Sequence, residues 1–180
     1  VFSWNINSDE PGFKQSAYRI IISDKLSEIK NYKGNIWDSG KKERSNQLQI
    51  KYTGESLKSG KQYYAKLRVW DKDGSSTKWS KTCRFVTPIN YPENWKSQWI
   101  TYRYHRDSAL PVFRKGFSIK DNKEIDYVRF YISAPGYYEA YLNGKKIGKN
   151  VLDPGQTNYD DYTYYTAYDI NSKKIGDKNV

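Results

Sequence analysis

Hydrophobic and polar residues alternate along several short stretches in the first half of the chain. Two stretches show the alternation most clearly, with one side formed by Tyr18, Ile20 and Ile22 in the first and by Tyr63, Ala65, Leu67 and Val69 in the second. A period of two is typical of a β-strand that buries one face. Turn residues such as Ser59-Gly60 and Asp73-Gly74 separate these stretches. The pattern predicts about seven short strands over residues 1–88.

The spacing of Leu57, Gly60 and Tyr63 matches the L-x-x-G-x-x-Y pattern of a tyrosine corner. In such a corner the tyrosine hydroxyl returns to the backbone a few residues upstream and closes a turn between two strands. The motif therefore favours an immunoglobulin-like or fibronectin-type-III-like sandwich for residues 1–88. Four aromatic residues are expected to be structural in it: Tyr63, Trp37, Trp70 and Trp79.

The second half of the chain repeats the strand pattern after a proline-rich segment at 89–94, which we interpret as a linker. Val128, Phe130 and Ile132 share one side of a predicted strand, and Asn143-Gly144 is a strong hairpin signal. Residues 95–180 are therefore predicted to form another antiparallel sandwich, incomplete at its C-terminus. The expected fold class is all-β, with two antiparallel β-sandwich domains in tandem and the second truncated.

Composition supports this class and limits the function. Aromatic residues make up 17% of the chain, with 18 Tyr and 6 Trp, and such residues suit pleated, half-buried surfaces. The formal net charge is +11, but basic and acidic residues are interleaved, so we expect a solvated surface and no nucleic-acid partner. No run approaches the roughly 18 apolar residues of a membrane span. The first four residues lack the features of a signal peptide, so any such leader is expected to have been removed.

The residue types that perform catalysis or bind metals are sparse. Asp160 and Asp161 are adjacent, so on a strand they would point to opposite faces and would not flank one bond. Residues 71–74 begin like a calcium loop but lack its further acidic positions, which favours a plain turn. His105 is the sole histidine, and Cys83, the sole cysteine, is expected to be a small buried hydrophobe beside Phe85. We predict no catalytic residue, no metal and no cofactor.

Several segments occur together in an order that is informative. In the first half they are Phe2-Ser3-Trp4, Gln15-Ser16-Ala17-Tyr18-Arg19-Ile20, Ile36-Trp37-Asp38-Ser39-Gly40-Lys41, Val69-Trp70-Asp71-Lys72-Asp73-Gly74 and Trp79-Ser80. In the second half they are Trp95, Trp99-Ile100, residues 136–144, Asp153-Pro154-Gly155-Gln156-Thr157-Asn158-Tyr159 and Tyr165-Thr166-Ala167-Tyr168-Asp169-Ile170. Over nearly its whole length the chain resembles the N-terminal region of bacterial α-L-rhamnosidases of glycoside hydrolase family 78.

The resemblance implies a domain order in which an immunoglobulin-like domain and a rhamnosidase N-terminal β-sandwich precede further β modules and a catalytic (α/α)6 barrel. It implies that the barrel releases terminal α-L-rhamnose with inversion, which needs two carboxyl groups about 6.5–9.5 Å apart. We therefore expect the chemistry to lie beyond Val180 and the main partner of this chain to be that barrel.

Sugar binding is the alternative that the second half leaves open. Tyr137, Tyr159, Tyr162 and Tyr164 form a candidate surface for stacking on sugar rings, although such tyrosines also pack on a sheet or a neighbouring domain. The Asp-Asn pair by which related modules bind rhamnose through calcium is missing at residues 134–137, so calcium-dependent binding is not expected.

The leading functional hypothesis is a non-catalytic accessory region of an α-L-rhamnosidase that acts on plant glycosides or polysaccharides. The first alternative is a stand-alone carbohydrate-binding module with rhamnose-containing glycans as its partners. The second is a basic adhesion or nucleic-acid-binding protein. The expected location is bacterial, in the periplasm or outside the cell.

Overall fold

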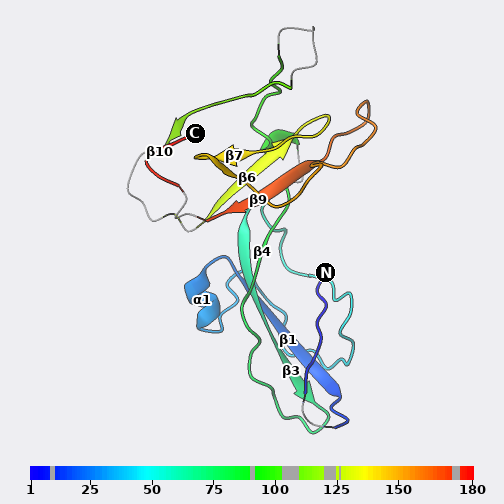
Figure 1. Ribbon diagram of the computed structural model, residues 1–180. Coiled ribbons are helices and arrows are strands. Elements are labelled where there is room, and N and C mark those ends of the chain that lie inside the picture. Colours follow the sequence, from blue (N-terminus) through cyan, green and yellow to red (C-terminus); the bar gives the residue numbers. More distant parts are fainter. Residues whose placement is uncertain (9–10, 90–91, 103–109, 120–124, 126, 172–174) are drawn as a thin grey trace. The chain divides into compact units, whose positions relative to one another are not determined.

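The structure is a computed structural model that describes residues 1–8, 11–89, 92–102, 110–119, 125, 127–171 and 175–180 (Figure 1). By their mutual contacts the residues divide into two compact units, Val1–Ile100 and Thr101–Val180. Within the described ranges the chain is mostly strand with a single five-residue α-helix, and every strand pair is antiparallel. The predicted all-β class with two domains is confirmed.

The first unit is built on a four-stranded sheet in the order β2-β1-β3-β4 (Figure 1). Its strands are β1 (Gln15–Ser23), β2 (Trp37–Asp38), β3 (Gln62–Asp71) and β4 (Cys83–Val86). β1 and β3 pair along almost their full length, with Tyr18 opposite Val69 and Ile22 opposite Ala65. The helix α1 (Leu26–Lys30) contacts both of these strands and buries Ile29.

The core of the first unit lies on one face of this sheet. Its buried members are Tyr18, Ile20, Ile22, Ile50, Tyr63, Ala65 and Val69, and Leu67 packs against them. These residues include both alternating sets, so the predicted buried faces of residues 18–22 and 63–69 are confirmed. Trp37 also packs here, stacked on Phe2 with ring centroids 6.2 Å apart.

Among its described residues, this unit contains four strands and not about seven. The other segments attach through isolated bridges such as Phe2 to Ile50. In one of these segments side-chain hydroxyls replace half of the backbone bonds: Ser80 Oγ accepts from Leu67 N–H at 3.0 Å and Thr77 Oγ1 from Val69 N–H at 3.3 Å, while the N–H groups of Thr77 and Ser80 still donate to the carbonyl oxygens of Val69 and Leu67. Residues 77–80 therefore follow the edge of β3 without forming a regular ladder.

The tyrosine at the start of β3 reaches back to the upstream turn. Tyr63 is almost fully buried, and its hydroxyl accepts a hydrogen bond from the backbone N–H of Lys58 at 2.9 Å. Its ring stacks on Phe85 of β4 at 5.7 Å between centroids. This is the arrangement of a tyrosine corner, in which one side chain joins the turn, β3 and β4.

The prediction that Cys83 is buried is wrong, because its side chain is exposed. Cys83 is the first residue of β4 and is opposite Ala65, at the end of the ladder between β3 and β4. Alternation places Cys83 on the same side as Phe85, but only Phe85, two residues further along, packs against the core. Alternation along a strand predicts on which side of the sheet a side chain lies, but it does not predict how far along the strand the core extends.

The segment around the predicted linker contains the 3-10 turn η1 (Pro92–Asn94), whereas residues 90–91 lie outside the described part of the chain. The bounds 1–88, 89–94 and 95–180 stay a prediction, as does the incompleteness of the second sandwich.

In the second unit the described residues form three pairs of strands. These are β6 (Val128–Ser133) with β9 (Tyr165–Ile170), β7 (Tyr141–Leu142) with β8 (Lys145–Lys146), and β5 (Phe117–Ser118) with β10 (Lys178–Asn179). Asn143 and Gly144 join β7 to β8 with φ of 50° and 76°, which confirms the predicted hairpin. Among the described side chains of this unit, Ile147 and Pro154 are buried, while Phe130 is 44% exposed.

We predict that Tyr63→Phe destabilises the first unit by about 1–2 kcal/mol, because the N–H of Lys58 loses its acceptor while the aromatic ring remains. Urea unfolding followed by fluorescence measures the change. Tyr32→Phe is the matched control, since its half-exposed ring has no hydrogen-bonded hydroxyl among the described residues, and it is expected to unfold like the wild type. Equal stability of both variants would contradict the role of the corner.

Candidate functional site

The four tyrosines predicted as a sugar-stacking surface lie at one end of the β6–β9 pair. Ser133, the last residue of β6, is opposite Tyr165, the first residue of β9, so the segments that leave these two positions start side by side. All four side chains are exposed, with fractions of 51% for Tyr137, 41% for Tyr159, 55% for Tyr162 and 51% for Tyr164. The strand register thus explains why residues about twenty-five positions apart meet.

Two local contacts hold these segments together. The hydroxyl of Tyr159 accepts a hydrogen bond from the backbone N–H of Gly136, next to Tyr137, at 2.9 Å. Ser133 Oγ donates to the carbonyl oxygen of Tyr164 at 2.9 Å. Tyr159 is therefore placed beside Tyr137, and its hydroxyl already has a partner within the protein.

The other two tyrosines form an edge-to-face pair. The rings of Tyr162 and Tyr164 are 5.5 Å apart between centroids at 67° to one another. Such an angle is favourable for two aromatic rings, but it does not provide one flat platform for a sugar. The four residues are exposed and lie in neighbouring segments, and their role in sugar binding stays a prediction.

The acidic residues nearby do not form a catalytic pair. Asp161 lies in a turn, where its carboxylate accepts a hydrogen bond from Asn158 Nδ2 at 2.7 Å. A hollow of about 330 Å³ in the same unit is lined by residues 142–143, 145–148 and 169–171. Its one acidic side chain, Asp169, pairs with Arg129 at 2.7 Å. This hollow therefore lacks the two facing carboxyl groups that glycoside hydrolysis needs.

The remaining candidates are not arranged as a metal site in the described part of the chain. The carboxylate of Asp71 accepts the backbone N–H groups of Asp73 and Ser75 and so closes the turn that was predicted there. Across the described ranges, no group of three or more His, Cys, Asp or Glu side chains is arranged to hold a metal ion. His105 lies outside the described residues. No helix among the described residues is long and apolar enough to cross a membrane.

Sequence reasoning missed a polar cluster that fastens the loop after β8. The hydroxyl of Tyr168 on β9 donates to Asp153 Oδ2 at 2.6 Å and lies 3.1 Å from the hydroxyl of Tyr138. Asn150 Nδ2 donates to the same carboxylate oxygen at 3.0 Å. The alternation of β9 predicts on which side of the strand Tyr168 lies. No local pattern predicts that the carboxylate of Asp153, fifteen residues earlier, accepts a hydrogen bond from its hydroxyl.

The cluster changes the acidity of one of its members. Burial, followed by the hydrogen bonds to Asp153 and Tyr138, raises the pKa of Tyr168 well above the ordinary value of tyrosine. Gly148 is also required here, because a side chain at that position would meet the Tyr168 ring at 2.5 Å and its φ is +76°. The arrangement is structural: it holds residues 148–153 against β9.

Comparison with known proteins assigns both halves of the chain. Residues 1–89 match the family described as the Rha78A-like N-terminal immunoglobulin domain, and residues 123–180 match the alpha-L-rhamnosidase N-terminal domain. The chain carries the two N-terminal domains of the alpha-L-rhamnosidase family. The resemblance noted in the sequence motifs is thereby confirmed.

Individual relatives agree with this assignment. An alpha-L-rhamnosidase of Formosa agariphila is 34% identical over 201 residues, which cover 100% of this chain and 21% of the relative. One from Alteromonas sp. (strain LOR) is 29% identical and covers 94% and 19% respectively. The chain thus spans about a fifth of the length of these rhamnosidases.

A solved structure supports the fold of this rhamnosidase region. The structure of an alpha-L-rhamnosidase from Dictyoglumus thermophilum aligns with 98% of this chain and 21% of its own, at 41% identity and a TM-score of 0.85. That of an alfa-L-rhamnosidase from Aspergillus terreus, at 24% identity and a TM-score of 0.75, supports the fold alone. In these homologous enzymes the matching region is accompanied by the rest of a much longer chain.

We predict that the stability of the second domain falls as the pH rises above about 10, the ordinary pKa of tyrosine. Because the pKa of Tyr168 is raised in the folded state, the unfolded state loses this proton first, and the contribution of Tyr168 is complete only below that pH. Tyr168→Phe should therefore lose less stability between about pH 9 and pH 11 than the wild type. Urea unfolding across this range measures it, with Tyr137→Phe as the exposed control. A pH dependence of Tyr168→Phe as steep as that of the control would disprove the cluster's effect.

Proposed function

We propose that this chain is a non-catalytic accessory region of an α-L-rhamnosidase that releases terminal α-L-rhamnose from plant glycosides or polysaccharides. The observation that supports the proposal most is the match of both halves to the N-terminal domains of this family, over a fifth of the length of its relatives. In this proposal the domains brace or position a catalytic (α/α)6 barrel, which is their main partner.

The chemistry of the described residues supports the same role. Inverting hydrolysis needs one carboxyl group as acid and another as base, on either side of the sugar. Asp169 is paired with Arg129, and the carboxylate of Asp161 is bound within its own turn. The hollow of the second domain that Asp169 lines has no second carboxylate among its lining residues.

A second candidate function is a carbohydrate-binding module, which is favoured by the four exposed tyrosines at the end of β6 and β9. The edge-to-face angle of Tyr162 and Tyr164 and the occupied hydroxyl of Tyr159 argue for packing within the protein or against another domain. We therefore rank it below the accessory role. A basic adhesion or nucleic-acid-binding role is ranked last, because it rests on net charge alone, and it predicts an affinity that falls steeply with salt.

The expected location is the periplasm or the exterior of a bacterial cell, where polymeric glycosides are met. Fractionation of the source cells, followed by detection of this chain, tests that location, and recovery from the cytoplasm alone would contradict it.

The accessory role predicts that the purified chain hydrolyses no aryl α-L-rhamnoside. Release of the chromogenic phenol is the readout, and the rhamnosidase of Dictyoglumus thermophilum serves as the positive control. The role also predicts no saturable heat when L-rhamnose is titrated into the chain. Hydrolysis above the buffer rate would contradict the proposal outright. Saturable rhamnose binding that is lost in Tyr164→Ala but kept in Tyr141→Ala would replace it by the binding-module alternative.

A further inference from the structure

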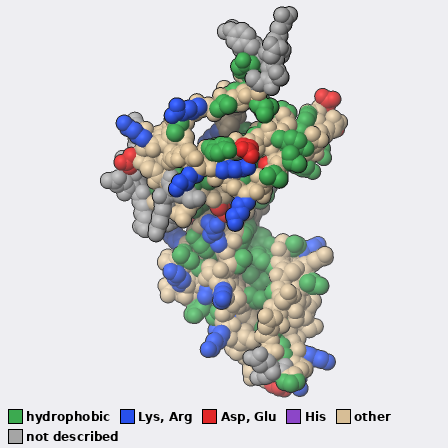
Figure 2. Space-filling view, viewed as in Figure 1, with side chains coloured by type: hydrophobic (Ala, Val, Ile, Leu, Met, Phe, Trp, Pro, Cys, Tyr) green, Lys and Arg blue, Asp and Glu red, His purple; other side chains and the backbone are tan. Residues whose placement is uncertain are grey.

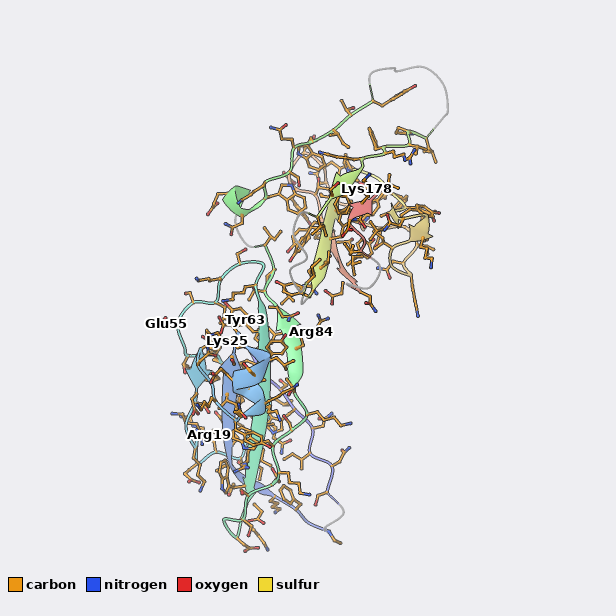
Figure 3. The ribbon with its side chains drawn as sticks, turned by 90° about the vertical axis from the view of Figure 1, so that its left-hand side faces the viewer. Arg19, Lys25, Glu55, Tyr63, Arg84 and Lys178 are labelled. Carbon is orange, nitrogen blue, oxygen red and sulfur yellow. The ribbon has the colours of Figure 1, made fainter. Side chains whose placement is uncertain are left out.

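The outer face of the β1–β3 pair gathers positive charge. Strand alternation that sends Ile20 and Leu67 toward the core sends Arg19, Lys66 and Arg68 to the opposite face. Arg19 lies directly opposite Arg68 across the two strands. Like charges in such positions repel one another, so this placement costs stability unless something compensates. Figure 3 views the sheet from the side of α1, with Arg19 labelled on β1.

Aromatic rings lie among these cations. The indole of Trp79 is 4.8 Å from the guanidinium carbon of Arg68 and 5.8 Å from that of Arg19. Tyr32 stacks on Trp79 at 5.7 Å and 14° between ring planes, and Lys66 Nζ lies 4.9 Å from the Tyr32 ring. We call these five residues the cationic stack. Attraction between each cation and a ring face offsets part of the repulsion between the cations.

The charge of the stack is only partly balanced by the protein. Asp38 on β2 binds Arg19 through both carboxylate oxygens, and Arg19 holds the pKa of Asp38 below its ordinary value. No other acidic partner of the stack occurs among the described residues. Arg68 Nε is buried, and among those residues it has no hydrogen-bond acceptor. Arg68 and Lys66 are both half-buried and pair with no acidic side chain among the described residues, so an anion could reach the outer ends of these side chains, although not the buried Nε.

The stack has the chemistry of a site for an acidic sugar. A guanidinium binds a carboxylate through two parallel hydrogen bonds, and an ammonium adds a second charge nearby. Lys66 and Arg68 are two residues apart on one face, which spaces them by about 6.6–6.8 Å along the strand. The Tyr32 ring stacks on Trp79 and lies near Lys66, yet the residue is 51% exposed, so part of the ring is open to solvent beside these charges. The C–H face of a sugar packs well on an aromatic ring, a contact that an acidic peptide or a mineral anion does not need.

We propose that the cationic stack binds an acidic polysaccharide, with Arg68 and Lys66 holding a uronate carboxylate and Tyr32 packing on the sugar ring. Figure 2 shows Lys and Arg side chains spread over the face of the molecule that it draws, and the formal net charge of +11 favours approach of a polyanion. The proposal goes beyond the accessory role: it concerns the first domain, needs no catalytic barrel, and differs from the tyrosines of the second domain in residues and in ligand chemistry.

Titration of the whole chain with oligogalacturonate at low salt, followed by calorimetry, tests the proposal. We expect saturable binding, and no binding of a neutral dextran of equal length. Lys66→Gln should weaken the affinity about tenfold, which corresponds to the loss of one favourable charge contact. Lys51→Gln is the matched control, because it removes the same charge from an exposed residue next to Ile50, which packs on the core face of the sheet. It should change the affinity less than about twofold.

Arg68→Lys distinguishes a shaped site from general attraction, because it keeps the charge and removes the two-pronged geometry. We expect it to weaken oligogalacturonate binding at least about fivefold, while its melting temperature shows that the domain is folded. Should Arg68→Lys fail to fold, the comparison of Lys66→Gln with Lys51→Gln decides alone.

Three results would overturn the proposal. The first is an absence of binding to oligogalacturonate. The second is an equal loss of affinity in Lys66→Gln and Lys51→Gln, which would show that only net charge matters. The third is equal affinity for polyglutamate of the same length, which would identify the stack as a site for acidic protein segments. None of these results bears on the rhamnoside assay, so failure here leaves the accessory role standing.

Discussion

The pairing of β1 with β3 decides which side chains of the first domain enter the core and which reach its outer face. With Arg19 opposite Arg68, the alternate residues that include Tyr18, Ile20 and Ile22 enter the core, whereas Arg19, Lys66 and Arg68 lie on the opposite face, on which Ile21 is also buried. A slip of β1 by one residue against β3 would turn its side chains over and bring Arg19 to the core face. The tyrosine corner, the packing of Trp37 and the cationic stack all depend on this register.

Sequence patterns predicted the elements whose information is local. Alternation identified the buried faces of β1 and β3, and Asn143-Gly144 identified the hairpin, because the positive φ of both residues is a property of the turn itself. Two expectations failed where the answer depends on distant residues. Cys83 has the right alternation but lies where the core has ended, and residues 77–80 follow β3 without forming a regular strand because the hydroxyls of Thr77 and Ser80 take part of the ladder bonds.

The sequence predicted less of the candidate sites than of the strands. The four tyrosines could be named because aromatic residues crowd one segment, but the angle between Tyr162 and Tyr164 depends on how two loops pack. The Tyr168–Asp153 contact and the meeting of Trp79 with Arg19 and Arg68 join residues from separate segments, and no spacing rule reveals them. Both clusters became visible only when the register placed their members.

The central claim for this rhamnosidase region is that the register of β1 and β3 sets both faces of the first sheet, while hydrolysis is proposed to take place in another part of the protein. Its most direct test is the register of β1 and β3, measured by NMR contacts between backbone protons across the two strands. The account predicts contacts between Arg19 and Arg68 and between Ile21 and Lys66, with slow amide exchange along both strands. Contacts from Arg19 to Leu67 or Val69 in place of Arg68 would contradict it.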